Sequence, residues 1–219
     1  SAILHCLLVI IDTWVFKMAV VEYFYATHSV YAYLGASKFI ELTSNQNHKI
    51  VHKPFNLPEA IIGAGSITIG ERSAAHLDYF FRREVERWSE FRGVPLKTFL
   101  PTHHFNSLAP SSAMLIAGSG LGLNIDKLAH AMMKFHWLYD ADLADKETLD
   151  TIARSVGIDP LPLLAVIESE QILKIFKANT MEAIKRSVFG SPTYIVDGDM
   201  FYGQDRLDLV ERALVKPFQ

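Results

Sequence analysis

The sequence predicts an α/β fold in which a β-α-β unit and a β-β-α unit enclose a long helical region. Three observations predict it: β-branched and aromatic residues fill positions 20–25, apolar residues recur at helical spacing over 77–91, and a strand–turn–strand pattern occupies 192–202. The chain has 219 residues, of which 50% are hydrophobic and 21% charged, so it is long and apolar enough to bury a full core.

The first predicted unit starts with a buried strand at 20–25 (VVEYFY). Apolar residues at helical spacing predict a helix over 30–42, and Ser29 stands where that helix takes its N-cap. Residues 50–52 are predicted as a second strand, which Pro54 helps to end. The order of this unit is therefore β-α-β.

The region between the two units is predicted to hold about five helices. They are expected over 77–91 with an end at Gly93, over 110–117, after a cap at Asn124, from a cap at Asp145 to Gly157, and over 169–188. Their apolar stripes are expected to form core and consist of Leu77, Phe80, Phe81, Val85, Trp88 and Phe91, then Leu128, Met132, Phe135 and Tyr139, then Ile172, Ile175, Phe176 and Ile184.

The last predicted unit is a hairpin followed by a helix. Residues 192–196 (PTYIV) form its first strand, Asp197-Gly198 is a hairpin-turn signal, and 200–202 form a short partner strand. An amphipathic helix follows Gly203, with Leu207, Val210 and Leu214 on one face. Without the helical region, the order of elements is that of the thioredoxin fold.

This order predicts a domain organisation. Residues 18–54 and 189–219 are expected to form one thioredoxin-like domain, and residues 55–188 are expected to be a helical insertion into it. Residues 1–17 are expected to be an N-terminal extension, with Met18 as the natural start; the alternative is an extra helix or strand packed on the domain.

Composition excludes several classes of partner. Lys and Arg number 21 against 24 Asp and Glu, and nucleic-acid binders usually carry a basic surplus, so no nucleic-acid partner is expected. The apolar stretch 1–17 contains Asp12 and is too short to span a bilayer, so no membrane partner is expected. Cys6 is the one cysteine, which excludes a disulfide framework and a Cys-x-x-Cys centre and favours a reducing compartment, the cytoplasm.

Two candidate sites fail on spacing. The nine histidines come without a His-Glu-x-x-His motif or a second cysteine, and the neighbours His103 and His104 would point apart, so no metal is expected and structural or surface roles are favoured. The glycine-rich segment 118–122 (GSGLG) follows a predicted helix instead of a strand. It is expected to be a turn between helices and not a phosphate loop.

Three positions at the ends of the thioredoxin-like elements remain as a candidate site. They are Ser29 at the start of the first helix, Ser191-Pro192 before the third strand, and Gln204-Asp205 at the opening of the last helix. Taken singly, each has an ordinary structural role as an N-cap, a first strand residue and a partner of a helix dipole.

Taken together, these positions lie in segments with a specific resemblance. Residues 188–207 (VFGSPTYIVDGDMFYGQDRL) resemble the C-terminal signature of 2-hydroxychromene-2-carboxylate isomerases, which are relatives of the kappa-class glutathione transferases. Residues 24–34 (FYATHSVYAYL) are similar to the strand–turn–helix of the same family. The resemblance covers the chain from about Val20 onward. It implies a DsbA-like fold, which is a thioredoxin domain with an inserted helical domain.

The resemblance also implies glutathione as a cofactor and a role for each site residue. Ser29 would be the catalytic serine that contacts the glutathione sulfur. Pro192 would be a cis-proline, Ser191 would supply backbone hydrogen bonds to the cysteinyl unit, and Gln204 and Asp205 would hold the γ-glutamyl end. A small aromatic carboxylate would be the substrate, and because kappa-class relatives are dimers, a homodimer is a candidate assembly.

The chain departs from the family pattern at two places. Val30 follows Ser29 where the family usually has proline, and Gly70-Glu71-Arg72 stands where the family often has a Gly-Asn-Arg-like segment. A glutamate cannot donate a hydrogen bond as an asparagine amide does, so that contact to glutathione is not carried over. Glu71, Arg72 and His28 are kept as candidate pocket residues, with a surface position as the alternative for His28.

The reaction that the resemblance implies is an isomerisation without consumption of glutathione. A thiolate would add reversibly to the hydroxychromene carboxylate, and ring opening, cis/trans rotation and expulsion of the thiolate would follow. One alternative is a kappa-like glutathione transferase that conjugates an electrophile. A second is a redox-inactive thioredoxin-fold binding module, whereas a disulfide oxidase would need two neighbouring cysteines.

Overall fold

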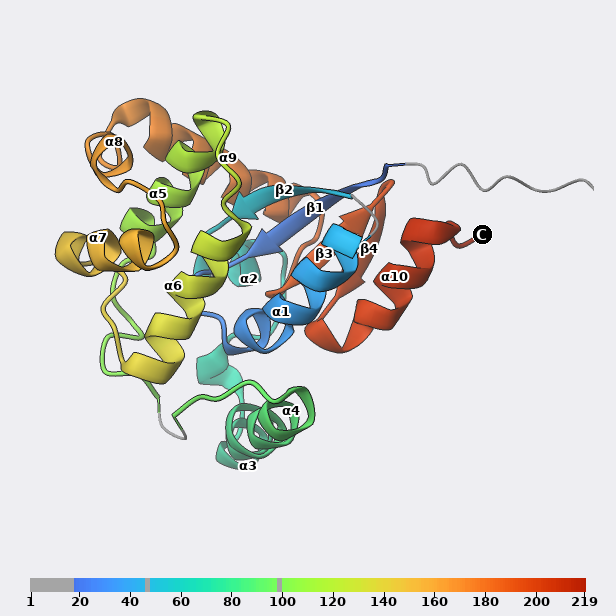
Figure 1. Ribbon diagram of the computed structural model, residues 1–219. Helices are drawn as coiled ribbons and strands as arrows, with labels where there is room; N and C mark the ends of the chain where they lie inside the picture. The colour runs from blue at the N-terminus through green and yellow to red at the C-terminus, as the bar shows by residue number, and fades with distance from the viewer. Residues whose placement is uncertain (1–17, 46–47, 98–99) are drawn as a thin grey trace, which may run out of the picture.

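The computed structural model describes residues 18–45, 48–97 and 100–219, so the predicted extension 1–17 lies outside the described residues (Figure 1). Its centre is a four-stranded sheet in the order β2-β1-β3-β4. The strands are β1 (Val20–Tyr25), β2 (Lys49–Pro54), β3 (Thr193–Val196) and β4 (Asp199–Tyr202). Strand β1 pairs in parallel with β2 and antiparallel with β3, and β3 pairs antiparallel with β4. This is the predicted thioredoxin order.

Helices cover both faces of the sheet. Helices α1 (Val30–Asn45) and α10 (Leu207–Val215) lie against one face, seen in front of the sheet in Figure 1. Helices α2 (Leu57–Gly63) and α9 (Glu170–Lys185) pack together on the other face. The strand alternation of β1 agrees with this arrangement, because Tyr23 joins the large core under α1 whereas Phe24 joins a smaller core with Phe55 and Ala183.

A further group of helices extends the large core. It consists of α5 (Ala109–Gly120), α6 (Asp126–Tyr139), α7 (Lys146–Ser155) and α8 (Leu161–Leu164). Helix α6 packs on α1, and α5 packs on α9 and β2, so one continuous set of buried residues runs from the sheet into this group. The limits 55–188 of the helical insertion stay a prediction, since α2 and α9 within them pack directly on the sheet.

The segment predicted as a helix over 77–91 is helical, but it is not one regular helix and only part of its apolar stripe is buried. The segment forms α3 (Ala74–Asp78), a π-helical turn η2 (Tyr79–Arg83) and α4 (Glu84–Arg92), which ends at Gly93 as expected. The π-turn interrupts the regular spacing of the stripe; Phe81 and Phe91 are exposed, whereas Val85 is buried as predicted. The segment also contacts few other elements, and Figure 1 shows α3 and α4 standing apart from the other helices.

The predicted helix caps and core positions agree with the structure only in part. Asp145 caps α7 by accepting from Thr148 N–H at 2.8 Å, as predicted. Asn124 accepts from Asp126 N–H, but the N-cap position of α6 is Ile125. The predicted core positions Tyr139, the last residue of α6, and Ile175 of α9 are 56% and 40% exposed, so the prediction of core is wrong at both. The short helices α2 and α8, the 3-10 turns η1 (Ile69–Glu71) and η3 (Gln204–Arg206) and the end of α9 at Lys185 were outside the predicted pattern.

The glycine-rich segment 118–122 forms the end of α5 and a turn before α6, so the prediction of a turn between helices is confirmed. The hairpin turn is confirmed as well: Asp197 and Gly198 have φ angles of 49° and 89°, the left-handed conformation that this turn requires.

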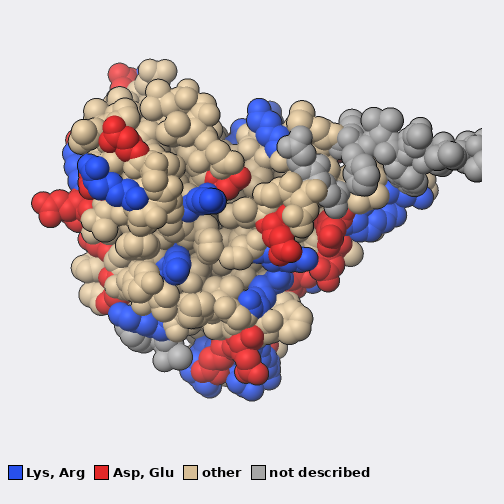
Figure 2. Space-filling model, in the orientation of Figure 1, with Lys and Arg blue, Asp and Glu red and all other residues tan. Residues whose placement is uncertain are grey.

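The surface carries charges of both signs. Figure 2 shows basic and acidic side chains interspersed over the face it presents, with several of each sign near the lower edge. No helix among the described residues is long and apolar enough to cross a membrane.

Helix α9 fixes the end of strand β2 through two polar contacts. The buried Asn179 side chain donates to Pro54 O at 3.0 Å, and Thr180 Oγ1 accepts from Asn56 N–H at 3.0 Å. A buried carbonyl that loses its donor costs about 1–3 kcal/mol. These contacts hold in place the segment that leads from β2 into α2.

We therefore expect Asn179→Ala to lower the free energy of unfolding by about 1–3 kcal/mol, measured by urea denaturation. Lys177→Ala, an exposed change on the same helix, serves as the control and should stay within about 0.5 kcal/mol of the wild type. Equal stability of Asn179→Ala and the control would show that the bond to Pro54 O does not hold β2.

Candidate active site

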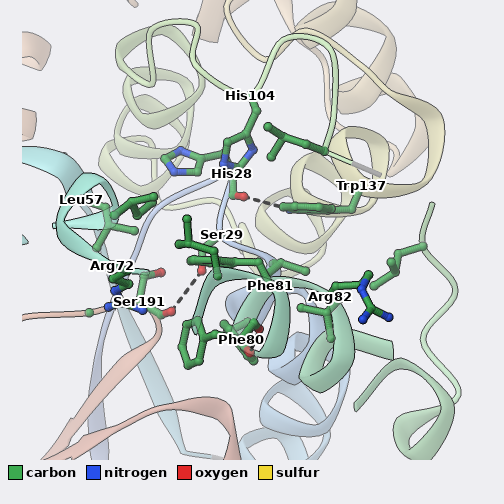
Figure 3. Close-up of a pocket in the computed structure, with 18 of the residues that line it drawn as sticks. His28, Ser29, Leu57, Arg72, Phe80, Phe81, Arg82, His104, Trp137 and Ser191 are labelled. Carbon is green, nitrogen blue, oxygen red and sulfur yellow. Dashed lines mark hydrogen bonds between the residues drawn. The ribbon is translucent and has the colours of Figure 1, made fainter. Parts of the chain in front are cut away.

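A pocket of about 340 Å³ lies where the start of α1, the residues before β3 and the α3–α4 segment meet (Figure 3). Its walls are mainly apolar and aromatic, and these wall residues are Leu57, Ile61, Ile69, Leu77, Phe80, Phe81, Val85, Leu96 and Trp137. The volume is in the range of small-molecule sites, and most of the stripe predicted as core in 77–91 lines it. The stripe therefore forms a pocket wall.

Ser29 lies in this pocket at the N-terminus of α1 and is 7% exposed. Its Oγ accepts from Ala32 N–H at 3.2 Å, which is the bond of an N-cap, and donates to Ser191 O at 3.0 Å. Figure 3 shows this second bond as a dashed line between the two residues. The hydroxyl thus caps α1 and also lines the pocket, so a structural role of Ser29 as an N-cap is compatible with a role in the site.

Ser191, which precedes β3, also contacts the loop between β1 and α1 through its side chain. Its Oγ accepts from Ala26 N–H at 3.0 Å, and its peptide bond to Pro192 is cis. Among the described residues, no partner is found for the Ser191 amide. Gly190, the preceding residue, packs so closely on the Tyr202 ring that a Cβ would come within 2.0 Å of it. The backbone before β3 is therefore held tightly and faces the pocket.

Gln204 and Asp205 lie beside the cis-proline but do not line the pocket. Gly203 N–H donates to Pro192 O at 2.9 Å, which brings the start of η3 next to the residues before β3. Gln204 is buried, and its Oε1 and backbone O accept from Arg92 of α4 at 2.7 and 2.9 Å. Asp205 Oδ2 pairs with Arg206 at 2.6 Å and is 40% exposed.

The two residues of the Gly-Glu-Arg segment point to different places. Arg72 lines the pocket with its guanidinium 5.1 Å from the centre of the Phe80 ring, and its Nε is buried with no partner among the described residues. Glu71 is exposed and accepts from Thr68 N–H and Oγ1, both at 2.7 Å, and these bonds lower the pKa of its carboxyl. Glu71 therefore caps the turn η1, and Arg72 supplies a pocket cation.

His28 lies in the pocket wall at the end of the β1–α1 loop. Its backbone O accepts from Trp137 Nε1–H at 2.9 Å, and its ring contacts that of His104 with centroids 4.7 Å apart (Figure 3). Burial and the nearby His104 and His136 lower its pKa to about 3. The sequence indicated His28 as a candidate pocket residue, but His104 was expected to have a structural or surface role and Trp137 was not indicated, because only the fold brings these distant segments together.

His28 also links stability to pH. A histidine pKa near 6.5 in the unfolded chain and about 3 in the folded protein means that the unfolded state binds more protons between these values. The stability contributed by the neutral ring is therefore complete above about pH 6.5 and is lost as the pH falls. His104 adds to the same trend, since burial and His136 lower its pKa to about 4.

We expect His28→Asn to lose less stability than the wild type between pH 7 and pH 4, by on the order of 1–3 kcal/mol, because one of the titrating rings is absent. Thermal unfolding followed by circular dichroism across this range measures it. His76→Asn, at an exposed position on α3, is the control and should retain the wild-type pH dependence. Parallel curves for His28→Asn and the wild type would exclude a buried neutral His28.

Comparisons with known proteins agree with this geometry. The model of the DsbA-like thioredoxin domain matches residues 20–215. A 2-hydroxychromene-2-carboxylate isomerase of Sphingobium xenophagum is 27% identical over 195 residues, covering 89% of this chain and 97% of the relative. Glutathione S-transferase kappa 2 of Caenorhabditis elegans is 24% identical over 218 residues, covering 91% and 93%.

Two solved structures share the fold. A 2-hydroxychromene-2-carboxylate isomerase superposes with a TM-score of 0.71 at 22% identity, covering 89% of this chain and 94% of that one. The cytosolic disulfide reductase DsbM of Pseudomonas aeruginosa, determined with GSH, superposes with a TM-score of 0.60 at 16% identity, covering 90% and 93%. The predicted resemblance to the isomerases and the predicted fold are confirmed, and the chain belongs to the DsbA-like thioredoxin-domain family.

Proposed function

We propose that this protein is a glutathione-dependent isomerase of 2-hydroxychromene-2-carboxylate-type aromatic acids. One observation carries the proposal: Ser29 at a helix N-terminus and Ser191 before the cis-proline share an aromatic-walled pocket with Arg72, whose Nε has no partner among the described residues. The relatives named as isomerases support the reaction class, and the kappa-class relative supports the use of glutathione.

The residues present fit glutathione. The free Ser191 amide is a donor to which an extended peptide can pair, as a β-strand adds to a sheet edge. Arg72 offers its buried Nε to a carboxylate, and the amides of the first turn of α1 favour an anion. We keep Gln204 and Asp205 as the groups that would hold the γ-glutamyl end, since η3 adjoins the cis-proline.

Bound glutathione would supply the thiolate that adds reversibly to the substrate and is released unchanged. The chain's contribution is to keep that sulfur ionised: the N-terminus of α1 and a hydroxyl donor each stabilise an anion over its protonated form. Each 1.4 kcal/mol of such preference lowers a thiol pKa by about one unit. Because the Ser29 hydroxyl donates to Ser191 O in this structure, it must turn away from that carbonyl to donate to the sulfur.

The substrate would occupy the apolar part of the pocket. Phe80 and Phe81 from the π-turn offer ring surfaces to an aromatic acid, and Trp137 closes the opposite side. Arg72 and Lys97 also line the pocket and supply positive charge for a carboxylate. The cytoplasm, where glutathione is plentiful and thiols stay reduced, is the proposed compartment, and a homodimer stays a prediction.

The second candidate function is a kappa-like transferase, favoured by the kappa-class relative. The two functions differ in the fate of glutathione, because a transferase consumes it and an isomerase recycles it. A redox-inactive binding module would use the same Ser191–Pro192 edge without any turnover.

The deciding measurement is turnover of 2-hydroxychromene-2-carboxylate by absorbance, with glutathione quantified before and after. We expect product formation that requires glutathione and leaves its concentration unchanged. Loss of one glutathione per product would favour the transferase. Glutathione binding by calorimetry without any turnover would favour the binding module, and absence of both would refute a glutathione enzyme.

Ser29→Ala should lower kcat by roughly 10- to 1000-fold, since it removes one donor to a developing anion. The lost cap should cost about 1 kcal/mol of stability, so the fold remains. Ser44→Ala, an exposed change near the end of the same helix, is the matched control and should keep wild-type kcat. A Ser29→Ala enzyme as fast as this control would reduce Ser29 to a helix cap.

A further inference from the structure

Three histidines lie in sequence between α6 and the pocket: His136 of α6, then His104, then His28. His136, 1% exposed, directs Nδ1 at Ala141 O at 3.0 Å, and its Nε2 lies 3.1 Å from Nδ1 of His104. The His104 ring in turn contacts the His28 ring. His28 and His104 line the pocket, and Figure 3 shows their rings next to each other at one end of it.

These contacts fix the position of the proton on His136 and on His104. Ala141 O can only accept, so His136 Nδ1 carries the hydrogen. A neutral His136 therefore has a bare Nε2, which can only accept, and His104 Nδ1 must donate to it. The remaining nitrogen, His104 Nε2, holds a lone pair. A backbone carbonyl 3.0 Å away from one histidine thus decides the tautomer of the next.

Burial holds both of these rings in the neutral state. Burial lowers the pKa values of His104 and His136, and the neighbouring His136 ring lowers that of His104 further. The bond to Ala141 O and the carboxylates of Asp140 and Asp142 raise the pKa of His136, and the His103 ring lowers it. Burial, which lowers the pKa, is the largest of these effects. At neutral pH, His104 is therefore a base and not a cation.

The lone pair of His104 is open to the pocket. Its Nε2 makes no hydrogen bond with any described residue, and the two nitrogens of an imidazole ring point in different directions, so Nε2 faces away from His136. Histidines buried for structural reasons normally satisfy both nitrogens. An imidazole with one nitrogen fixed by a partner and the other open to a cavity has the arrangement of a general base.

Resting on the proposed function, we propose that His104 is the proton acceptor and donor for ring opening, with His136 as its positioning residue. The substrate class has a carbon that bears both a hydroxyl and the ring oxygen. His104 Nε2 takes the hydroxyl proton, the bond from that carbon to the ring oxygen breaks, and a carbonyl forms. The imidazolium returns the proton to the released phenolic oxygen, so no oxidant, reductant or net proton is needed.

A bound carboxylate would make His104 a stronger base. An anion close to His104 favours the imidazolium and raises the ring's pKa from about 4 toward neutrality, where a general base works best. Arg72, which also lines the pocket, would hold that carboxylate, so the proton transfer would be fastest when the correct substrate is bound.

The test uses the full chain and two readouts. Nitrogen-15 NMR of the protein alone at pH 7 should show His104 protonated at Nδ1, and His136→Phe should abolish this preference. In the isomerase assay His104→Gln should lower kcat by about 100-fold or more with a small change in KM. His136→Phe should lower kcat less, and His103→Gln, whose ring lies outside the pocket wall, should equal the wild type.

A His104 protonated at Nε2, or an unchanged kcat in His104→Gln beside an active wild type, would overturn the inference and leave the proposed function standing. A loss confined to KM would also overturn it, because it would show that His104 only binds substrate. A wild-type protein that folds, shows the expected tautomer and does not isomerise the substrate would refute the proposed function, and the catalytic role of His104 with it.

Discussion

The site depends on one pair of hydrogen bonds that ties the β1–α1 loop to the residue before the cis-proline. Ser29 Oγ–H donates to Ser191 O, and Ala26 N–H donates to Ser191 Oγ. These bonds join segments more than 160 residues apart and hold the first turn of α1 against the exposed backbone before β3. A helix dipole and a strand edge can act on one small molecule only when they are fixed in this way.

The two halves of the fold contribute different chemistry. The sheet, with α1 and η3, supplies backbone donors and a serine at fixed positions, which suits the binding of a peptide. The helical region supplies the aromatic walls, Arg72 and the histidine chain, which suit an aromatic acid and its proton transfers. Arg92 connects the halves, because it leaves α4 and binds both the side chain and the backbone of Gln204.

Sequence patterns were sufficient for the strands, the hairpin turn, the Asp145 cap and the family, since each is set by neighbouring residues or by a continuous motif. They failed where distant segments decide the outcome. The stripe through Phe80 and Phe81 has the spacing of a core helix, yet a π-turn and sparse contacts make it a pocket wall. His104 and His136 are 32 positions apart, and nothing local indicates that their rings meet.

The π-helical turn Tyr79–Arg83 has an evolutionary consequence. A π-turn holds one residue more than an α-turn, so a single-codon deletion there would restore a regular helix and rotate everything before it by about 100° relative to α4. The aromatic side chains that line the pocket would change, while Ser29 and the backbone before β3 kept their residues. Length variation in this one surface helix could thus give the descendants of one ancestor a differently shaped pocket, without any substitution at the N-terminus of α1 or before the cis-proline.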